Sequence, residues 1–432
     1  MRGGEPTSRT KWLTGFVAVT VGASLGWSMA ELAASLGSGE KAPREVRPRE
    51  NVPPEHLPLP QVLREPLCPY PVHEGEPRLR LVEVAKGFAA PVHIASPPKD
   101  PRLFVLESRG RIRIVEDGTI RPRPFFEFPE PRSVASPRAT PAYRFGTLAF
   151  HPRHQQNGRL FLSYVDVERE LSRVVELHVG DDPERADFES TFPLLEVPLP
   201  TLDQEAASLA FGPDGYLYVA LGDGGTPRDP HLYAQRTDTL LGKVLRIDVD
   251  RTSATAPYAY PDENLQGPRV RGEIWALGVH RPRGLAFDRA TRDLWLADRG
   301  ELYFDEIDAV RTSDSGLNLG WSFVEGSFCL GRVPCDSEGL TPPVFEVARS
   351  GRCSIVGGRV YRGCRMPALD GDYFFGDGCG RIRSLRREGG EVVANERIEP
   401  SKAMGIQALG EDASGELYVV ADDGVLYRIE PE

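Results

Sequence analysis

A loop of closely spaced acidic residues is the part of the sequence best suited to hold a divalent cation. Between positions 298 and 306 it combines carboxylates with a glycine whose backbone carbonyl is not shielded by a side chain. Ca²⁺ takes six to eight oxygen ligands and accepts backbone carbonyls beside carboxylates. The candidate ligands are Asp298, Gly300, Glu301, Asp305 and Glu306. The alternative is an ordinary acidic loop in contact with solvent.

A cluster of basic side chains lies just before this loop. His280, Arg281 and Arg283 place three groups that can carry positive charge within four positions. Arginine binds carboxylates through two parallel hydrogen bonds, so such a cluster is a candidate anion site. A surface loop with solvated arginines is the alternative.

The rest of the sequence excludes several classes of protein. It contains no Gly-x-Ser-x-Gly nucleophile motif, no P-loop and no His-Glu-x-x-His zinc motif. The net charge is −11, and the body of the chain has no Lys/Arg-rich run. We therefore expect no nucleic-acid partner, because binding phosphates requires a basic surface.

A repeated pattern of strands must position these residues. The 44 glycines and 39 prolines are spread along the chain, which indicates many turns and short strands. In each of six units, a turn leads into a strand with alternating apolar residues, and a second turn and strand usually follow. The units occupy residues 100–118, 157–179, 212–250, 291–311, 369–385 and 414–429. They predict an all-β, six-bladed β-propeller, and an open β-sandwich array is the alternative.

The N-terminal region has a different composition. An uncharged run at positions 12–30 follows several basic residues, which is typical of a signal peptide or an uncleaved membrane anchor. A stretch rich in proline and charge comes next and has the composition of a linker. We expect a signal peptide or anchor at 1–36, a Pro-rich linker at 37–77 and the propeller at 78–432. The propeller is then extracytoplasmic, and only the N-terminal segment contacts the membrane.

Six cysteines fit an exported domain, because disulfides persist outside the cytoplasm. Sequence alone does not fix their connectivity. Two of them lie in one loop, two flank the entry and first hairpin of the fifth unit, and the remaining two can tie the linker to the body. The corresponding pairs are Cys329–Cys335, Cys353–Cys379 and Cys68–Cys364.

Several long motifs resemble one enzyme family. SLAFGPDGYLYVALGDGG (208–225), EIWALGVHRPRGLAFD (273–288) and LDGDYFFGDGCGRI (369–382) are similar to the glucose/sorbosone (aldose sugar) dehydrogenases that depend on pyrroloquinoline quinone (PQQ). The similarity runs from about residue 81 to residue 429, and several motifs resemble the branch of hedgehog-interacting-protein-like propellers. The resemblance implies PQQ bound beside Ca²⁺ and a histidine that takes the hydroxyl proton of a sugar as hydride passes to the quinone. The expected partner is a small sugar or an extracellular protein.

The position of the family's histidine base carries a residue that cannot take a proton. Gln204 stands there, and Ala206 and Ala207 replace the two glycines of the motif. Loss of a positioned general base typically costs about 10²- to 10⁴-fold in rate. Asp223, which in the family orients the histidine, is retained, although an Asp-Gly pair is also typical of a turn.

The resemblance also locates cofactor contacts. In the family's cofactor motif His280 replaces an arginine and Arg281 replaces an asparagine, while Arg283 adds a further cation. Tyr143 lies in a second cofactor stretch, 142–147, which departs from the family pattern. The family places Ca²⁺ at the 298–306 loop, but its Gly-Pro backbone ligands are not matched here.

Two functional hypotheses follow from these departures. The first is an exported propeller whose sugar oxidation is weak or lost, while binding of a carbohydrate or protein ligand is retained. The alternative is an active, divergent quinone-dependent sugar or aldehyde dehydrogenase that uses another base, either His231 or His280.

Overall fold

The computed structural model describes the folded body of the chain. The described residues are 68, 70–129, 141–253, 256–331, 338–349, 353–388, 391–398 and 404–432, within a unit of residues 51–432. The predicted signal or anchor segment and most of the predicted linker lie outside the described residues. In the part that is described, we find no helix that is both long and apolar enough to cross a membrane.

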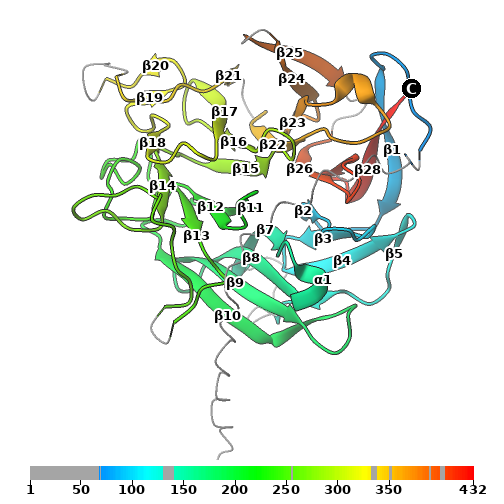
Figure 1. The fold of residues 1–432 in the computed structure, drawn as a ribbon, viewed down its shortest axis with the longest axis horizontal. Coiled ribbons are helices and arrows are strands. Elements are labelled where there is room, and N and C mark those ends of the chain that lie inside the picture. Colours follow the sequence, from blue (N-terminus) through cyan, green and yellow to red (C-terminus); the bar gives the residue numbers. More distant parts are fainter. Residues whose placement is uncertain are drawn as a thin grey trace, which may run out of the picture. The chain divides into compact units, whose positions relative to one another are not determined.

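Six mainly antiparallel sheets surround a common centre (Figure 1), which confirms the predicted six-bladed propeller. Blade 1 contains β2 (Pro91–Ala95), β3 (Leu103–Glu107), β4 (Arg111–Glu116), β5 (Thr119–Ile120) and β6 (Phe126–Glu127). Blade 2 contains β7 (Tyr143–Phe150), β8 (Arg159–Asp166), β9 (Leu171–Val179) and β10 (Ala186–Pro198). Blade 3 contains β11 (Ser208–Phe211), β12 (Leu217–Leu221), β13 (Lys243–Ile247), β14 (Ile274–Leu277) and β18 (Leu317–Asn318).

The remaining blades follow the same plan. Blade 4 contains β15 (Pro282–Phe287), β16 (Asp293–Asp298), β17 (Phe304–Arg311) and β21 (Phe345–Ala348). Blade 5 contains β22 (Ile355–Val360), β23 (Tyr373–Asp377), β24 (Ile382–Glu388) and β25 (Glu391–Ile398). Blade 6 contains β26 (Ile406–Glu411), β27 (Leu417–Ala421), β28 (Val425–Pro431) and β1 (Leu79–Lys86). Outside the blades lie the pair β19 (Val324–Glu325) and β20 (Phe328–Cys329), the helix α1 (His154–Asn157) and the 3-10 turn η1 (Pro367–Leu369).

Each predicted repeat supplies the second and third strands of one blade. The first unit, 100–118, forms β3 and β4, and the last, 414–429, forms β27 and β28. Every residue of β3, β12 and β27 is buried. These strands are covered on both faces because each blade packs between two neighbours, and their apolar residues therefore form continuous runs.

The first strand of every blade lines the centre of the ring. Each contacts the first strands of both neighbouring blades, in the order β2, β7, β11, β15, β22, β26 and back to β2. Glycines permit the approach of blades 4 and 5, since a β-carbon on Gly284 would lie 2.5 Å from the Cα atom of Gly357. Larger side chains at these two positions would push the blades apart.

The two ends of the propeller close the ring. β1 pairs antiparallel with β28, from Leu79 opposite Pro431 to Lys86 opposite Val425, and the two strands lie side by side in Figure 1. The segment before β1 also packs on the body, because the Tyr70 ring lies 4.5 Å from the guanidinium carbon of Arg365. The end of the predicted linker is therefore part of the folded structure.

Two of the predicted disulfides are confirmed. Cys68 and Cys364 are bonded with their Cα atoms 5.5 Å apart, and Cys353 and Cys379 with theirs 5.1 Å apart. Cys329 is also disulfide-bonded. Its predicted partner, at position 335, lies outside the described residues.

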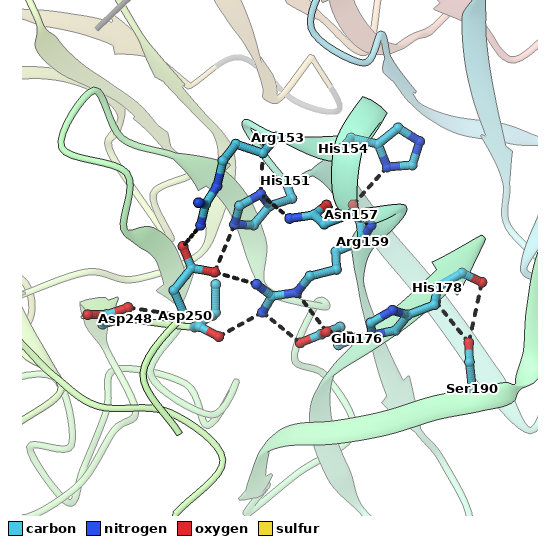
Figure 2. A network of polar contacts seen from close by, with 11 residues as sticks. His151, Arg153, His154, Asn157, Arg159, Glu176, His178, Ser190, Asp248 and Asp250 are labelled. Carbon is cyan, nitrogen blue, oxygen red and sulfur yellow. Dashed lines mark hydrogen bonds and ion pairs between the residues drawn. The ribbon is translucent and has the colours of Figure 1, made fainter. Parts of the chain in front are cut away.

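A network of charged side chains joins blades 2 and 3 (Figure 2). Asp250, which follows β13, accepts hydrogen bonds from Arg159 on β8, from Arg153 at 2.7 Å and from His151 at 3.2 Å. Arg159 also donates to both carboxylate oxygens of Glu176 on β9, at 2.8 and 3.1 Å. Although burial alone would raise the pKa of Asp250, these partners hold it well below its ordinary value. Asp250 therefore anchors blade 3 to the charged groups of blade 2.

Replacing this anchor should destabilise the propeller. Asp250→Ala leaves Arg159 without one of its two carboxylate partners, and the Asp250 side chain is 31% exposed. We expect a loss of about 2 kcal/mol in the free energy of unfolding, between the values for surface and for fully buried ion pairs. Urea unfolding at neutral pH measures this loss in the free energy of unfolding. The control Asp238→Ala removes an exposed pair with Arg236 and should change little, so equal effects of the two variants would contradict the anchoring role.

Candidate functional site

A cavity of about 200 Å³ lies where the first strands of the six blades meet. Each blade contributes at least one polar side chain to its wall. These side chains are His93, Arg144, Thr147, Gln204, Glu205, Ser208, Arg283, Arg359 and Gln407. The volume is below the roughly 300–1,000 Å³ of pockets for drug-sized ligands, so the cavity suits one smaller molecule.

Positive charge exceeds negative charge in the cavity wall. Arg144, Arg283 and Arg359 line it, and among the described residues Glu205 is the single acidic side chain that does so. Glu205 is hydrogen-bonded to Arg283. His93 is neutral, because burial and then the nearby charge of Arg359 lower its pKa to about 3. The cavity therefore favours an anionic ligand.

Gln204 is buried, and both ends of its amide are engaged. Its Oε1 accepts a hydrogen bond from the backbone N–H of Gly224 at 2.9 Å, and its Nε2 donates to the carbonyl of Glu205 at 3.1 Å. The side chain lies against Gly222, where a β-carbon would come within 2.5 Å of the Gln204 Nε2 atom. The amide is therefore held as part of the wall and offers no basic atom to a ligand.

The two alanines that follow Gln204 face in different directions. Ala206 lines the cavity, and a β-carbon on Gly146 would lie 2.6 Å from its β-carbon. Ala207 is buried in the apolar core between blades 2 and 3. Only Ala206 therefore narrows the space available to a ligand.

Asp223 and His280 form a buried pair beside Gln204. The Oδ2 atom of Asp223 accepts a hydrogen bond from the indole N–H of Trp321 at 2.8 Å and lies 4.0 Å from the Nε2 atom of His280. The Trp321 ring stacks on the His280 ring with their centroids 3.9 Å apart. The Nδ1 atom of His280 donates to the carbonyl of Arg299 at 2.7 Å, so its Nε2 lone pair faces Asp223. Neither Asp223 nor His280 lines the cavity.

Burial keeps this pair close to neutral. Burial raises the pKa of Asp223 to about 7, although the hydrogen bonds from Gly225 and Trp321 act to lower it. It lowers the pKa of His280 well below the usual range, and the charge of Arg281 acts in the same direction. Below about pH 7 the pair therefore holds its proton on the carboxyl of Asp223.

The predicted cationic cluster is ordered by one carboxylate. The oxygens of Asp298 accept the backbone N–H groups of His280 at 2.7 Å and of Arg281 at 2.6 Å. The Arg281 side chain pairs with Asp203 at 3.0 Å. Of the cluster, only Arg283 lines the cavity, and burial raises the pKa of Asp298 to about 7.

The acidic loop is organised by a carboxylate that the sequence analysis did not identify. One oxygen of Glu325 accepts the backbone N–H groups of four successive residues, 301–304, at 2.8 to 3.2 Å. Asp305 accepts the N–H of Gly300 at 3.0 Å and pairs with Arg349 at 2.5 Å. Glu301 accepts the N–H of Arg228 at 2.7 Å. The loop thus turns N–H groups, not carbonyl oxygens, toward its centre.

This arrangement does not fit Ca²⁺. Among the described residues, no three His, Cys, Asp or Glu side chains converge where a metal ion could be held. Glu306 accepts the N–H of Gly326, and burial, reinforced by Asp308, raises its pKa well above the usual range. A protonated carboxyl is a poor ligand for a hard cation. The carboxylates of the predicted ligands Asp298 and Asp305 likewise accept protein hydrogen bonds.

PQQ fits the cavity in charge but not in space. The arginines of the wall suit its carboxylates, whereas the closed Gln204 amide and about 200 Å³ leave too little room for a fused three-ring molecule. Tyr143 does not line the cavity, because its ring packs against Phe128 and Tyr164. Its neighbour Arg144 faces the cavity instead, since successive residues of a strand point to opposite faces.

Comparisons with known proteins identify relatives. The family model described as Glucose / Sorbosone dehydrogenase matches residues 88–428. Hedgehog-interacting protein of Homo sapiens is 29% identical over 380 residues, which cover 80% of this chain and 52% of that protein. This chain therefore spans about half the length of that relative.

Solved structures share the fold. The apo-form of the soluble aldose sugar dehydrogenase of Escherichia coli matches with a TM-score of 0.67 at 22% identity, over 82% of this chain and 100% of that chain. The PQQ-bound aldose sugar dehydrogenase of Streptomyces coelicolor matches with a TM-score of 0.62 at 20% identity, over 83% of this chain and 100% of that chain. At these identities the likeness establishes the propeller architecture.

The raised pKa of Asp223 predicts a pH dependence of stability. Between the ordinary pKa of Asp and about 7, the folded state holds a proton that the unfolded state releases, so stability falls as the pH rises through this window. Asp223→Asn removes this titrating group. As the pH rises from about 5 to 7, the difference in the free energy of unfolding between the variant and the unchanged protein should shift by roughly 2–3 kcal/mol in favour of the variant. Denaturant unfolding across this range measures it. Parallel profiles for the two proteins would show that Asp223 does not titrate as described.

The Glu325 contacts predict a loop that is independent of metal. Glu325→Ala removes the acceptor of four amides and should accelerate hydrogen exchange at residues 301–304 by at least about tenfold. The control Glu346→Ala removes an acceptor for the Ser327 hydroxyl and should leave these amides protected. Neither EDTA nor Ca²⁺ should move the melting temperature of the unchanged protein. Stabilisation of several degrees by Ca²⁺ would contradict this interpretation.

Proposed function

Because the chain belongs to the glucose/sorbosone dehydrogenase family and carries Gln204 where the resemblance places the histidine base, we propose that it is an exported propeller that binds a sugar in its central cavity with little or no oxidation. The single observation that carries this proposal is the state of the Gln204 amide, which is buried and hydrogen-bonded at both ends. Sugar oxidation requires a group that accepts the hydroxyl proton, and a satisfied amide supplies none.

The other histidines near the cavity are poor replacements for that base. The Nε2 atom of His280 faces Asp223, and His280 does not line the cavity. His93 does line the cavity, but its pKa of about 3 makes it a weak base at neutral pH. His231 is exposed and also lies outside the cavity lining. These positions support weak or lost catalysis over the alternative of an active enzyme with a relocated base.

Export is proposed from the leader and supported by the cysteines. The uncharged run at 12–30 follows basic residues, as in a signal peptide or anchor. The disulfides Cys68–Cys364 and Cys353–Cys379 are of a kind that persists in oxidising compartments. We propose a periplasmic, secreted or membrane-anchored location, with a linker between the leader and the propeller.

A protein ligand is a second candidate, favoured by one surface feature. Leu302, Tyr303 and Phe328 are apolar and about two-fifths exposed, and the rings of Tyr303 and Phe328 lie 3.8 Å apart. The hydrogen bonds to Glu325 fix this loop before any partner arrives. Exposed apolar patches are typical of interaction sites. In a binding assay with a candidate partner, Tyr303→Asp should abolish binding of a protein and leave sugar binding in the cavity unchanged.

An activity assay tests the proposed loss of catalysis. Protein supplied with PQQ and Ca²⁺ should reduce a dye on a panel of aldoses at least about 100-fold more slowly than an active family member assayed in parallel. Gln204→His should recover little, because Ala206 still narrows the cavity. The double variant with Ala206→Gly should recover more, whereas Ala207→Gly would only weaken the core.

The matched control is Gln407→His, which introduces a histidine from the opposite blade of the same cavity and should gain no activity. Isothermal titration with neutral sugars and sugar acids measures binding separately from turnover. Oxidation by the unchanged protein at the rate of the active family member would contradict the proposal.

A further inference from the structure

Two arginines on opposite sides of the central cavity have no anionic partner among the described residues. Arg144 lies on β7 of blade 2 and Arg359 on β22 of blade 5, and these blades face each other across the ring. Arg144 donates to the carbonyls of Leu202 and Gln204, the latter at 3.0 Å. Arg359 donates to the carbonyl of Gly358 at 2.9 Å. Within the described part of the chain, neither guanidinium forms an ion pair.

The surrounding carboxylates do not supply the missing charge. Glu205 is hydrogen-bonded to Arg283, which also lines the cavity. Glu411, whose charge acts on Arg359 from further away, is paired with Arg289 at 3.0 Å. A cation removed from water without a counter-charge is unfavourable, and burial indeed lowers the pKa of Arg359. The positive charge of the cavity wall is therefore left unbalanced unless an anion binds.

The remaining polar groups suit hydroxyls. The amide of Gln407 makes one long contact among the described residues, 3.5 Å to the carbonyl of Gly405. The Ser208 hydroxyl contacts the carbonyl of Pro282 at 3.4 Å. Both are at the limit of hydrogen-bond distance and are available to a ligand. A cavity of about 200 Å³ with such groups is larger than an inorganic anion requires.

We propose that the central cavity binds a sugar acid of monosaccharide size. Its carboxylate is held by the unpaired Arg144 and Arg359, and its hydroxyls bond to Gln407 and Ser208. This inference rests on the proposed function for the sugar part of the ligand, while the arginines supply the carboxylate. A neutral sugar would fill the same space and leave both cations without a partner.

Isothermal titration of the full chain with D-glucuronate, D-glucose, PQQ and inorganic phosphate tests the inference. D-glucuronate should bind at least about 100-fold more tightly than D-glucose, because charge-assisted hydrogen bonds are the stronger ones. Added salt should weaken D-glucuronate binding and leave D-glucose binding unchanged. Arg359→Met should reduce affinity for D-glucuronate at least about tenfold, and Arg359→Lys should restore part of it.

Two further variants make the result interpretable. Arg236→Met removes an arginine that is 48% exposed, pairs with Asp238 and lies outside the cavity lining, so affinity should stay unchanged. Arg144→Met tests the opposite wall and replaces the Arg359 variant if that protein fails to fold. A melting temperature of Arg359→Met no lower than that of the unchanged protein would support an unpaired cation.

The possible outcomes separate the two proposals. Equal affinity for D-glucose and D-glucuronate would overturn the sugar-acid assignment and leave sugar binding in place. Binding of PQQ or phosphate as tight as that of D-glucuronate would also overturn it, because the carboxylate would then be recognised without the sugar. Binding of none of these molecules would contradict both the proposed function and this inference.

Discussion

Six sheets close into a ring only if their first strands approach one another closely at the centre. The contact between Gly284 and Gly357 shows how little space this leaves, since neither position admits a β-carbon without movement. The same strands form the cavity wall, so packing and ligand recognition depend on one set of residues. The pairing of β1 with β28 holds the ring at this diameter, and the Cys68–Cys364 disulfide attaches the preceding segment.

The sequence predicted the strands that carry the regular pattern and missed those that form the site. The second and third strands of each blade are buried on both faces, so their apolar runs are easily recognised. The first strands carry polar residues toward the cavity, and Arg144 and Arg359 are among them. Trp321 reaches Asp223 from a loop and Glu325 reaches the acidic loop from the short strand β19, and no local pattern connects Trp321 with Asp223 across 98 positions.

Two side chains of this protein fill places to which the family resemblance assigns other groups. The Gln204 amide lies where the resemblance places a histidine base, and the Glu325 carboxylate lies at the centre of the loop where it places a cation. These changes are mutually consistent, because a loop whose N–H groups point inward requires an anion and rejects a metal ion. The cationic wall is the exception, since no carboxylate among the described residues pairs with Arg359.

The placement of Arg144 and Arg359 half a ring apart has a mechanical consequence. A molecule held by both arginines would link blade 2 directly to blade 5. Adjacent blades pack face to face and are joined by contacts such as that of Asp250 with Arg159. A molecule bound at the centre would then stiffen the whole ring of blades, and a change in the curvature of any blade would alter the central cavity.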